Sequence, residues 1–171
     1  MRKNFYPDTQ LNTVYELTPQ WLSSRGVKAL ICDLDDTLAP YFDTTPTEKL
    51  AAWVQSMRDA GIKICILSNG KKHRITPFCQ TLGIDVVPMA AKPLPFGYFR
   101  ALKRLGVKRK EVVAIGDQIF TDILGGNCVG IHTVLVEPIA YKTSKMERRK
   151  RRYEKQFRRV LKRTKQKGKA C

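Results

Sequence analysis

The sequence predicts an α/β fold in which a parallel sheet is flanked by helices. Short apolar runs with strand character alternate along the chain with segments that have helical spacing. This alternation is typical of parallel strands joined by helical crossovers. The chain has 171 residues, of which 43% are hydrophobic, which is enough for one domain with its own core. The clearest strand-like runs are residues 29–32, 64–67, 112–115 and 133–136.

Helix start and stop signals separate these runs. Thr18-Pro19 predicts the start of a short helix that Gly26 ends. Residues 45–48 (TPTE) combine a capping box with a first-turn proline, so we expect a helix from there to Gly61. The remaining elements are expected at 74–82 (helix), 85–87 (strand) and 95–106 (helix).

We expect three parts within a single domain. Residues 1–26 form an N-terminal segment packed on the core, 27–140 form the core, and 141–171 form a basic helix and tail. No apolar stretch approaches the ~20 residues of a transmembrane helix, and the N-terminus lacks a signal peptide's apolar core. The five cysteines include no C-x-x-C pair, which favours reduced thiols. These features predict a cytoplasmic location.

Polar residues follow the strand-like runs. DLDDT follows the first run at 33–37, SNG follows the second at 68–70, and GDQIFTD occupies 116–122 at the end of the third. A lysine and a proline lie between the last two, at 92–93. Because ligands bind at the carboxyl edge of a parallel sheet, we expect these segments to build one site.

The first of these segments carries two carboxylates one residue apart, Asp33 and Asp35. Strand alternation would point both the same way if the strand continued through them. Two like charges that close are unfavourable unless a cation compensates them. Mg²⁺ is a hard ion that takes carboxylate oxygens, so the sequence predicts Mg²⁺ as the cofactor.

The four segments, in this order, resemble the signatures of the haloacid dehalogenase superfamily of phosphohydrolases. The GDQxxTD form of the last one, followed by Gly125-Gly126-Asn127, resembles subfamily IIIA and its YqeG-like branch. The likeness covers roughly residues 27–136 and extends to phosphatidylglycerophosphate phosphatases of the same superfamily. It implies a Rossmann-like fold of this superfamily and a phosphatase activity.

The resemblance also implies roles for individual residues. Asp33 would be the nucleophile that forms an aspartyl-phosphate, and Asp35 would be the general acid and base. Ser68, helped by the backbone N–H of Asn69, would bind a phosphoryl oxygen. Lys92 would neutralise charge on the phosphoryl group and on the nucleophile.

The metal ligands implied by the resemblance come from both ends of this set. Mg²⁺ would be bound by Asp33, by Asp117 and by the carbonyl of Asp35. Asp122 would be a direct or water-mediated ligand. Asp36 stands where this branch often has asparagine, and we expect its side chain to point away from the metal.

Structural interpretations compete with these roles. Ser68 is also a good helix N-cap, and Lys92 before a proline is also typical of a solvated loop. An acid such as Asp122 is favourable in the first turn of a helix. Thr37 either orients its loop through its hydroxyl or is only a turn residue.

The spacing of the segments leaves no room for an inserted cap domain. Ser68 follows Asp33 by 35 residues, which is enough for a loop and one helix. We therefore expect a capless, open site. Within the superfamily this resembles enzymes that act on large or surface-bound substrates, or enzymes closed by an oligomeric partner.

The positive charge is concentrated at the end of the chain. Residues 142–169 include 15 Lys and Arg and only two Glu, so most of the net charge of +17 lies there. If helical, this segment places Met146, Tyr153, Phe157 and Leu161 near one face. It could dock on the core, make peripheral contact with an anionic membrane, or contact RNA or ribosomes.

The sequence therefore predicts a Mg²⁺-dependent phosphomonoester hydrolase that forms an aspartyl-phosphate. Its partner is a phosphorylated substrate, with the phospholipid headgroup of phosphatidylglycerophosphate as a candidate. A soluble metabolite or nucleotide phosphatase is one alternative. An RNA- or ribosome-associated protein that uses its basic tail is another.

Overall fold

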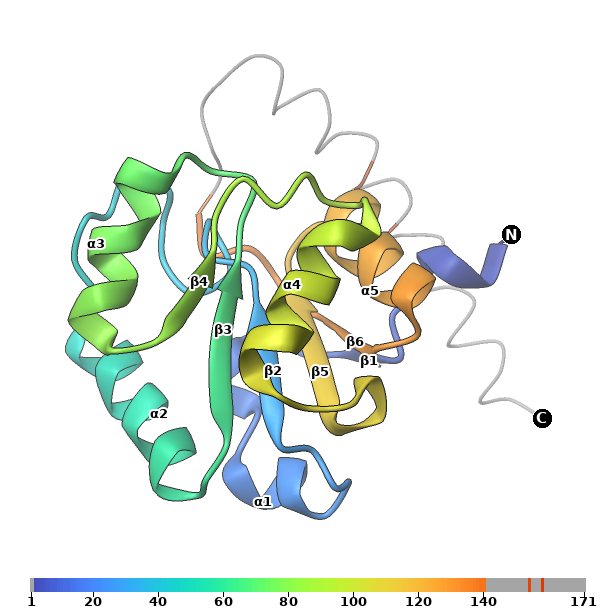
Figure 1. Ribbon diagram of the computed structural model, residues 1–171, viewed down its shortest axis with the longest axis horizontal. Coiled ribbons are helices and arrows are strands. Elements are labelled where there is room, and N and C mark those ends of the chain that lie inside the picture. The colour runs from blue at the N-terminus through green and yellow to red at the C-terminus, as the bar shows by residue number, and fades with distance from the viewer. Residues whose placement is uncertain (1, 141–153, 155–157, 159–171) are drawn as a thin grey trace. The chain divides into compact units, whose positions relative to one another are not determined.

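The computed structural model describes residues 2–140, 154 and 158. Contacts divide the chain into two units, Met1–Ala140 and Tyr141–Cys171. The first unit is a parallel sheet flanked by helices, which confirms the predicted fold class (Figure 1). The basic helix predicted within 141–171 falls almost wholly outside the described residues and stays a prediction.

Six parallel strands form the sheet in the order β1-β6-β5-β2-β3-β4. Five of them match the predicted runs to within about a residue. The edge strand β1 was not predicted, because two residues are too short to show a period. The strands are β1 Thr9–Gln10, β2 Ala29–Cys32, β3 Lys63–Leu67, β4 Asp85–Val87, β5 Val112–Gly116 and β6 His132–Leu135.

Within residues 2–140, five α-helices connect or flank these strands. Thr18 caps α1 as predicted, since its side chain accepts a hydrogen bond from the Trp21 N–H at 3.2 Å. The α-helices are α1 Pro19–Ser23, α2 Glu48–Asp59, α3 Lys72–Leu82, α4 Pro95–Leu105 and α5 Leu124–Val129. Short 3₁₀ or π-helical turns are η1 Arg2–Phe5, η2 Val14–Glu16, η3 Arg109–Glu111 and η4 Ile119–Ile123.

The start of α2 differs from the prediction. Its N-cap is Thr47, whose side chain accepts from the Leu50 N–H at 3.2 Å, and not Thr45. Pro46 therefore lies before the helix instead of in its first turn. The end near Gly61 is as predicted, because this glycine has a φ of 74°. Helix α3 begins two residues before the predicted 74.

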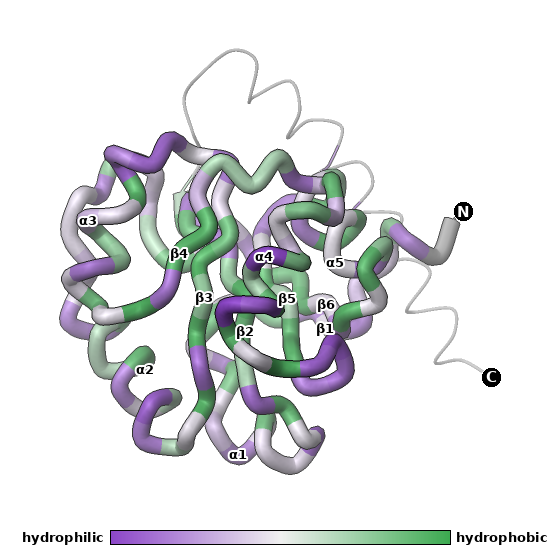
Figure 2. Tube along the Cα trace, in the orientation of Figure 1, coloured by the Kyte–Doolittle hydropathy of each residue, from purple (hydrophilic) through white to green (hydrophobic). Residues whose placement is uncertain are grey.

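The central strands are buried on both faces. Leu30 and Cys32 of β2 pack on the side covered by α1, α2 and α3. Ala29 and Ile31 of the same strand pack against α4 and α5 on the other side. Strands with two covered faces are mainly apolar, as Figure 2 shows for β2, β5 and the part of β3 that follows the exposed Lys63.

The strand order places a crevice beside β2. The chain runs outward from β2 through β3 to β4, and then returns to β5 on the opposite side of β2. At such a reversal the loops after the two central strands diverge, and ligands bind between them. No helix within the described ranges is long and apolar enough to cross a membrane.

Candidate active site

The site begins where β2 and β5 end side by side. Cys32 pairs with Ile115, and the Asp33 N–H donates to the Ile115 carbonyl at 2.9 Å. Asp33 and Asp117 therefore leave adjacent strands at the same level of the sheet. Both are buried, with Asp117 fully so. This is the convergence that the sequence predicts for the polar segments after the strands.

Lys92 joins two carboxylates in this buried space. Its Nζ donates to Asp33 Oδ1 and to Asp122 Oδ1, each at 2.7 Å. The exposed fraction of the three side chains is between 4% and 7%. Buried charges are stable only when paired. The interpretation of Lys92 as a solvated loop lysine is therefore wrong.

Burial by itself lowers the pKa of Lys92, but the carboxylates of Asp122 and Asp33 raise it by more, so the ammonium stays charged. Burial raises the pKa of Asp122 to about 6, against the lowering effect of Lys92. The neighbouring charge of Asp33 acts in the same direction as burial. The single ammonium of Lys92 therefore does not balance the negative charge of the carboxylates around it.

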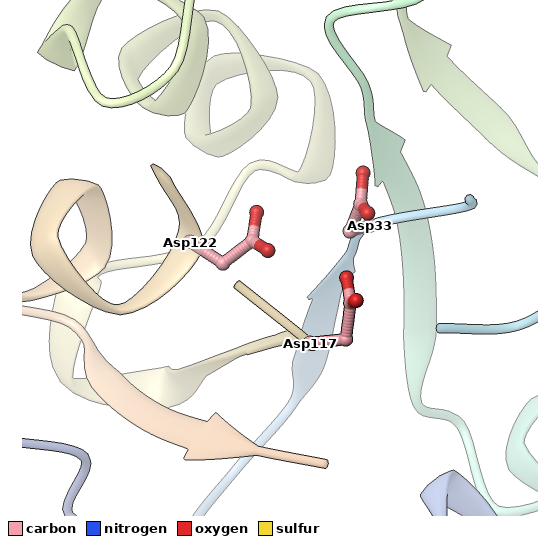
Figure 3. Close-up of side chains that lie close together, drawn as sticks. All are labelled: Asp33, Asp117 and Asp122. Carbon is pink, nitrogen blue, oxygen red and sulfur yellow. The ribbon is translucent and has the colours of Figure 1, made fainter. Parts of the chain in front are cut away.

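A third carboxylate completes a potential metal site. Oxygens of Asp33, Asp117 and Asp122 lie within 4.8 Å of one another. Figure 3 shows the three side chains pointing toward a common space. The Thr37 hydroxyl donates to Asp117 Oδ1 at 3.3 Å, so this threonine orients a site residue. Three hard oxygen donors with excess negative charge fit a divalent cation such as Mg²⁺.

Asp122 is held from several directions. Its Oδ2 accepts a hydrogen bond from the Gln118 N–H at 3.1 Å, inside the π-helical turn η4. The Tyr98 hydroxyl of α4 donates to the Asp122 carbonyl at 3.0 Å. Asp122 lies in the first turn of a helical segment, as expected for an acid that only stabilises a helix start. It also pairs with Lys92, which a role in the helix alone does not require.

The loops carrying Ser68 and Lys92 are tied together. The Asn69 side chain donates to the Lys92 carbonyl at 3.1 Å, and its Oδ1 accepts from the Lys92 N–H at 2.7 Å. This reciprocal contact leaves no pattern in the sequence and was not predicted. Ser68 is buried and its Oγ accepts from the Gly70 N–H at 3.1 Å. It is not a helix N-cap, because the cap of α3 is Lys71.

Asp35 lies beyond the end of β2. Strand β2 ends at Cys32, and Asp36 has a φ of 61°, so the chain turns and strand alternation does not apply to Asp35. Arg74 of α3 binds the Asp35 carboxylate instead, with its Nη2 at 2.7 Å from Oδ1 and 2.6 Å from Oδ2. Arg74 was missed because nothing in its local sequence distinguishes it from other surface arginines.

One hollow lies away from these residues. A hollow of about 380 Å³ is lined by Arg58, Lys63 and Asp85 among others, at the amino ends of β3 and β4. The carboxylate cluster, by contrast, lies at the opposite edge of the sheet, where β2 and β5 end. Buried carboxylates that pair with an ammonium at this edge of an α/β sheet suit the binding of phosphoryl groups together with a divalent cation.

Comparison with known proteins agrees with this interpretation. The chain belongs to the haloacid dehalogenase-like hydrolase family, whose model matches residues 41–130. It is 38% identical over 168 residues to a protein of Bacillus subtilis strain 168 named probable phosphatase YqeG, covering 98% of this chain and 96% of that one. The resemblance found in the sequence is thereby confirmed, and the chain is a phosphatase.

One further relative and several solved structures are also similar to this chain. The chain is 32% identical over 108 residues to a glyceraldehyde 3-phosphate phosphatase of Methanopyrus kandleri, covering 58% of this chain and 44% of that one. Its fold is similar to a 3-deoxy-D-manno-octulosonate 8-phosphate phosphatase from Yersinia pestis, with 16% identity, a TM-score of 0.50, and coverage of 67% and 75%. A Listeria monocytogenes protein gives a TM-score of 0.53 at 20% identity, covering 64% of this chain and 78% of that one.

Proposed function

We propose that this phosphatase hydrolyses phosphomonoesters with Mg²⁺ and through an aspartyl-phosphate on Asp33. One observation carries the proposal: the carboxylate oxygens of Asp33, Asp117 and Asp122 lie within 4.8 Å of one another. Lys92 bonds to two of these carboxylates at 2.7 Å. A nucleophile, a fixed cation and a second cation site are what phosphoryl transfer needs, since it depends on positioning and on neutralising charge.

Asp33 and Asp117 would hold the metal, with the Asp35 carbonyl and Asp122 completing the protein ligands. When bound, Mg²⁺ supplies positive charge that stabilises the phosphoryl oxygens. Lys92 supplies a second, fixed positive charge at the nucleophile. Ser68, whose loop is tied to that of Lys92 through Asn69, would donate its hydroxyl to a phosphoryl oxygen.

The reaction has two steps. A carboxylate oxygen of Asp33 forms a bond to phosphorus while the bond from phosphorus to the ester oxygen breaks, and Asp35 donates its proton to that leaving oxygen. Water then attacks the phosphorus and gives a proton to Asp35. The bond between phosphorus and Asp33 breaks, which releases inorganic phosphate and restores both carboxyl groups.

For the substrate we propose a phosphate displayed on a lipid, with phosphatidylglycerophosphate as the candidate. Several exposed large apolar side chains lie on segments that follow the carboxyl ends of the strands. They are Phe42, Met89, Leu94, Phe96, Phe120 and Ile139, with exposed fractions from 39% to 71%. A contiguous patch of exposed apolar side chains is typical of an interaction surface, and we propose that these side chains contribute to one that contacts lipid.

The basic segment supports the same substrate. It is joined to the core just after Ile139, whose N–H donates to the Asp36 carbonyl at 2.8 Å beside the site. Each basic residue near an anionic leaflet contributes ~1 kcal/mol, so several would recruit the enzyme to a membrane surface. We therefore propose peripheral contact with anionic membranes.

A soluble substrate is the second candidate. It is favoured by the similarity to the glyceraldehyde 3-phosphate phosphatase of Methanopyrus kandleri, whose named substrate is a small sugar phosphate. A role for the basic segment in contacting RNA or ribosomes is a third possibility, and co-purifying RNA that disappears when residues 142–171 are removed would favour it.

A panel of phosphate esters tests the proposal. We expect turnover with Mg²⁺, loss of turnover with EDTA, and no detectable turnover by Asp33→Asn. Phosphatidylglycerophosphate in anionic vesicles should be the better substrate, and Phe42→Ser with Phe96→Ser should reduce its turnover while p-nitrophenyl phosphate is still hydrolysed. Unchanged turnover by Asp33→Asn would refute the nucleophile, and preference for soluble sugar phosphates would refute the lipid substrate.

A further inference from the structure

Arg74 of α3 connects two parts of the site that are distant in sequence. Its Nη2 lies 2.7 Å and 2.6 Å from the two oxygens of Asp35. Its Nη1 donates to the Tyr41 carbonyl at 3.2 Å, and its Cζ lies 4.5 Å from the centre of the Tyr41 ring. We propose that Arg74 is a positioning residue, which sets the orientation of Asp35 and of the loop after β2 together. The inference rests on the proposed role of Asp35 as general acid and base.

Asp35 lies in a tight turn beyond the end of β2. It pairs with Ala39 in an isolated β-bridge and precedes a residue with a φ of 61°, so its side chain leaves the turn and not a continuous strand or helix. The residue is 7% exposed, and a carboxylate at that depth requires a paired cation. Arg74 lies on an eleven-residue helix and supplies that cation from a rigid element.

The contact leaves Asp35 able to work. A carboxylate has about four lone-pair positions on its two oxygens. A single nitrogen of Arg74 contacts both oxygens, so this contact uses no more than one lone-pair position on each oxygen. Asp35 can therefore carry a proton to a leaving oxygen, or accept one from water, while Arg74 stays bound.

Tyr41 extends the effect to the loop. The guanidinium stacks on the Tyr41 ring, and the Tyr41 ring meets the Phe42 ring edge-on with their centres 5.2 Å apart. Ordering a loop residue costs backbone entropy, which these contacts offset. One side chain thus sets both the orientation of the general acid and the conformation of the loop after β2.

Gly70 provides the space for this arrangement. A Cβ on Gly70 would lie 2.9 Å from Arg74 Nη2 and 2.7 Å from Ile75 Cδ1, closer than real contacts allow. The last residue of the 68–70 segment is therefore small where Arg74 passes. This gives a second way to disturb Arg74 without removing it, through Gly70→Ala.

A positioning role for the general acid has a distinctive consequence. An alkyl ester such as glycerol 3-phosphate must have its leaving oxygen protonated, whereas p-nitrophenolate departs without a proton. The test compares kcat/KM for the two esters, because kcat/KM covers the steps up to departure of the leaving group. We expect Arg74→Ala to lose ~100-fold with the alkyl ester and less than ~10-fold with the aryl ester.

Three variants calibrate the result. Arg74→Lys keeps the charge but lacks the planar group that stacks on Tyr41, so its loss should be intermediate. Gly70→Ala should show the same preference for the aryl ester, more weakly. Lys72→Ala, on the same turn of α3 and exposed, should match the wild type. Millimolar guanidinium should restore part of the alkyl ester activity of Arg74→Ala.

The outcomes separate this inference from the proposed function. Equal losses for both esters, or no loss, in a folded Arg74→Ala would overturn the positioning role while Asp33→Asn remains inactive. If Arg74→Ala does not fold, Gly70→Ala decides in the same way. If Asp33→Asn retains activity in the same assay, the proposed function itself fails.

Discussion

At the scale of single residues, the position of Asp122 depends on a missing side chain. A Cβ on Gly116, the last residue of β5, would overlap the Asp122 carboxylate. Position 116 requires glycine because the Asp122 side chain, which pairs with Lys92, occupies the space that a Cβ would need. This contact explains why a glycine ends a buried strand in which every other residue is apolar with a side chain.

Gly116→Ala tests this contact. The added methyl group pushes Asp122 away from Lys92, which leaves a buried ammonium with one partner fewer. We expect at least a ~10-fold loss of kcat and weaker Mg²⁺ affinity by calorimetry, because phosphoryl transfer depends on the position of charge. Gln118→Ala is the control. Wild-type activity and Mg²⁺ affinity in Gly116→Ala would contradict the account.

The residues around Lys92 could be predicted from the sequence, whereas the partner of Asp35 could not. Asp33, Lys92, Asp117 and Asp122 meet as predicted, because register in a parallel sheet brings the ends of adjacent strands together. The partner of Asp35 was not predictable. A contact between a loop and a helix face 39 residues away leaves no periodic pattern in the sequence.

At the scale of elements, the start of α2 shows how a local signal can be misplaced. TPTE contains two threonines that could cap the helix, and the side-chain contact to the Leu50 N–H selects Thr47. The strand β1 and the π-helical turn η4 were not predicted at all. β1 is defined by pairing with β6, and η4 by the bonds around Asp122, and neither is a local property of the sequence.

The two threonines can be compared directly. Thr47→Ala removes an N-cap hydrogen bond and should lower the free energy of unfolding by about 1 kcal/mol in urea titration. Thr45→Ala, two residues earlier and exposed, should leave it within ~0.5 kcal/mol of the wild type. A larger decrease in the free energy of unfolding for Thr45→Ala than for Thr47→Ala would instead support Thr45 as the N-cap, as predicted from the sequence.

At the scale of the whole molecule, the sheet separates two apolar clusters, and cysteines contribute to both. Cys32 and Cys79 lie on the α1–α3 side, and Cys65 lies on the α4–α5 side. All three are buried thiols, as the sequence predicted for Cys32 and Cys65. Burial raises the pKa of Cys32, and it raises the pKa of Cys65 and of Cys79 from 9.0 to about 12.

These thiols make stability depend on alkaline pH. Above about pH 9 the unfolded chain loses thiol protons that the folded chain keeps, so the unfolded state binds fewer protons and the free energy of unfolding falls until about pH 12. Each thiol contributes up to ~1.4 kcal/mol per pH unit in this window. Cys79→Ala should flatten the decline measured by urea unfolding between about pH 9 and about pH 11. An identical slope would contradict the burial of this thiol.

The central claim is that carboxylates from the ends of β2 and β5 hold a divalent cation beside a phosphorylated Asp33. A crystal structure with Mg²⁺ and beryllium fluoride, which mimics an aspartyl-phosphate, tests it most directly. We predict Mg²⁺ at about 2.1 Å from oxygens of both Asp33 and Asp117, with the fluoride group on Asp33. An ion bound elsewhere, or the fluoride group on another residue, would contradict the account.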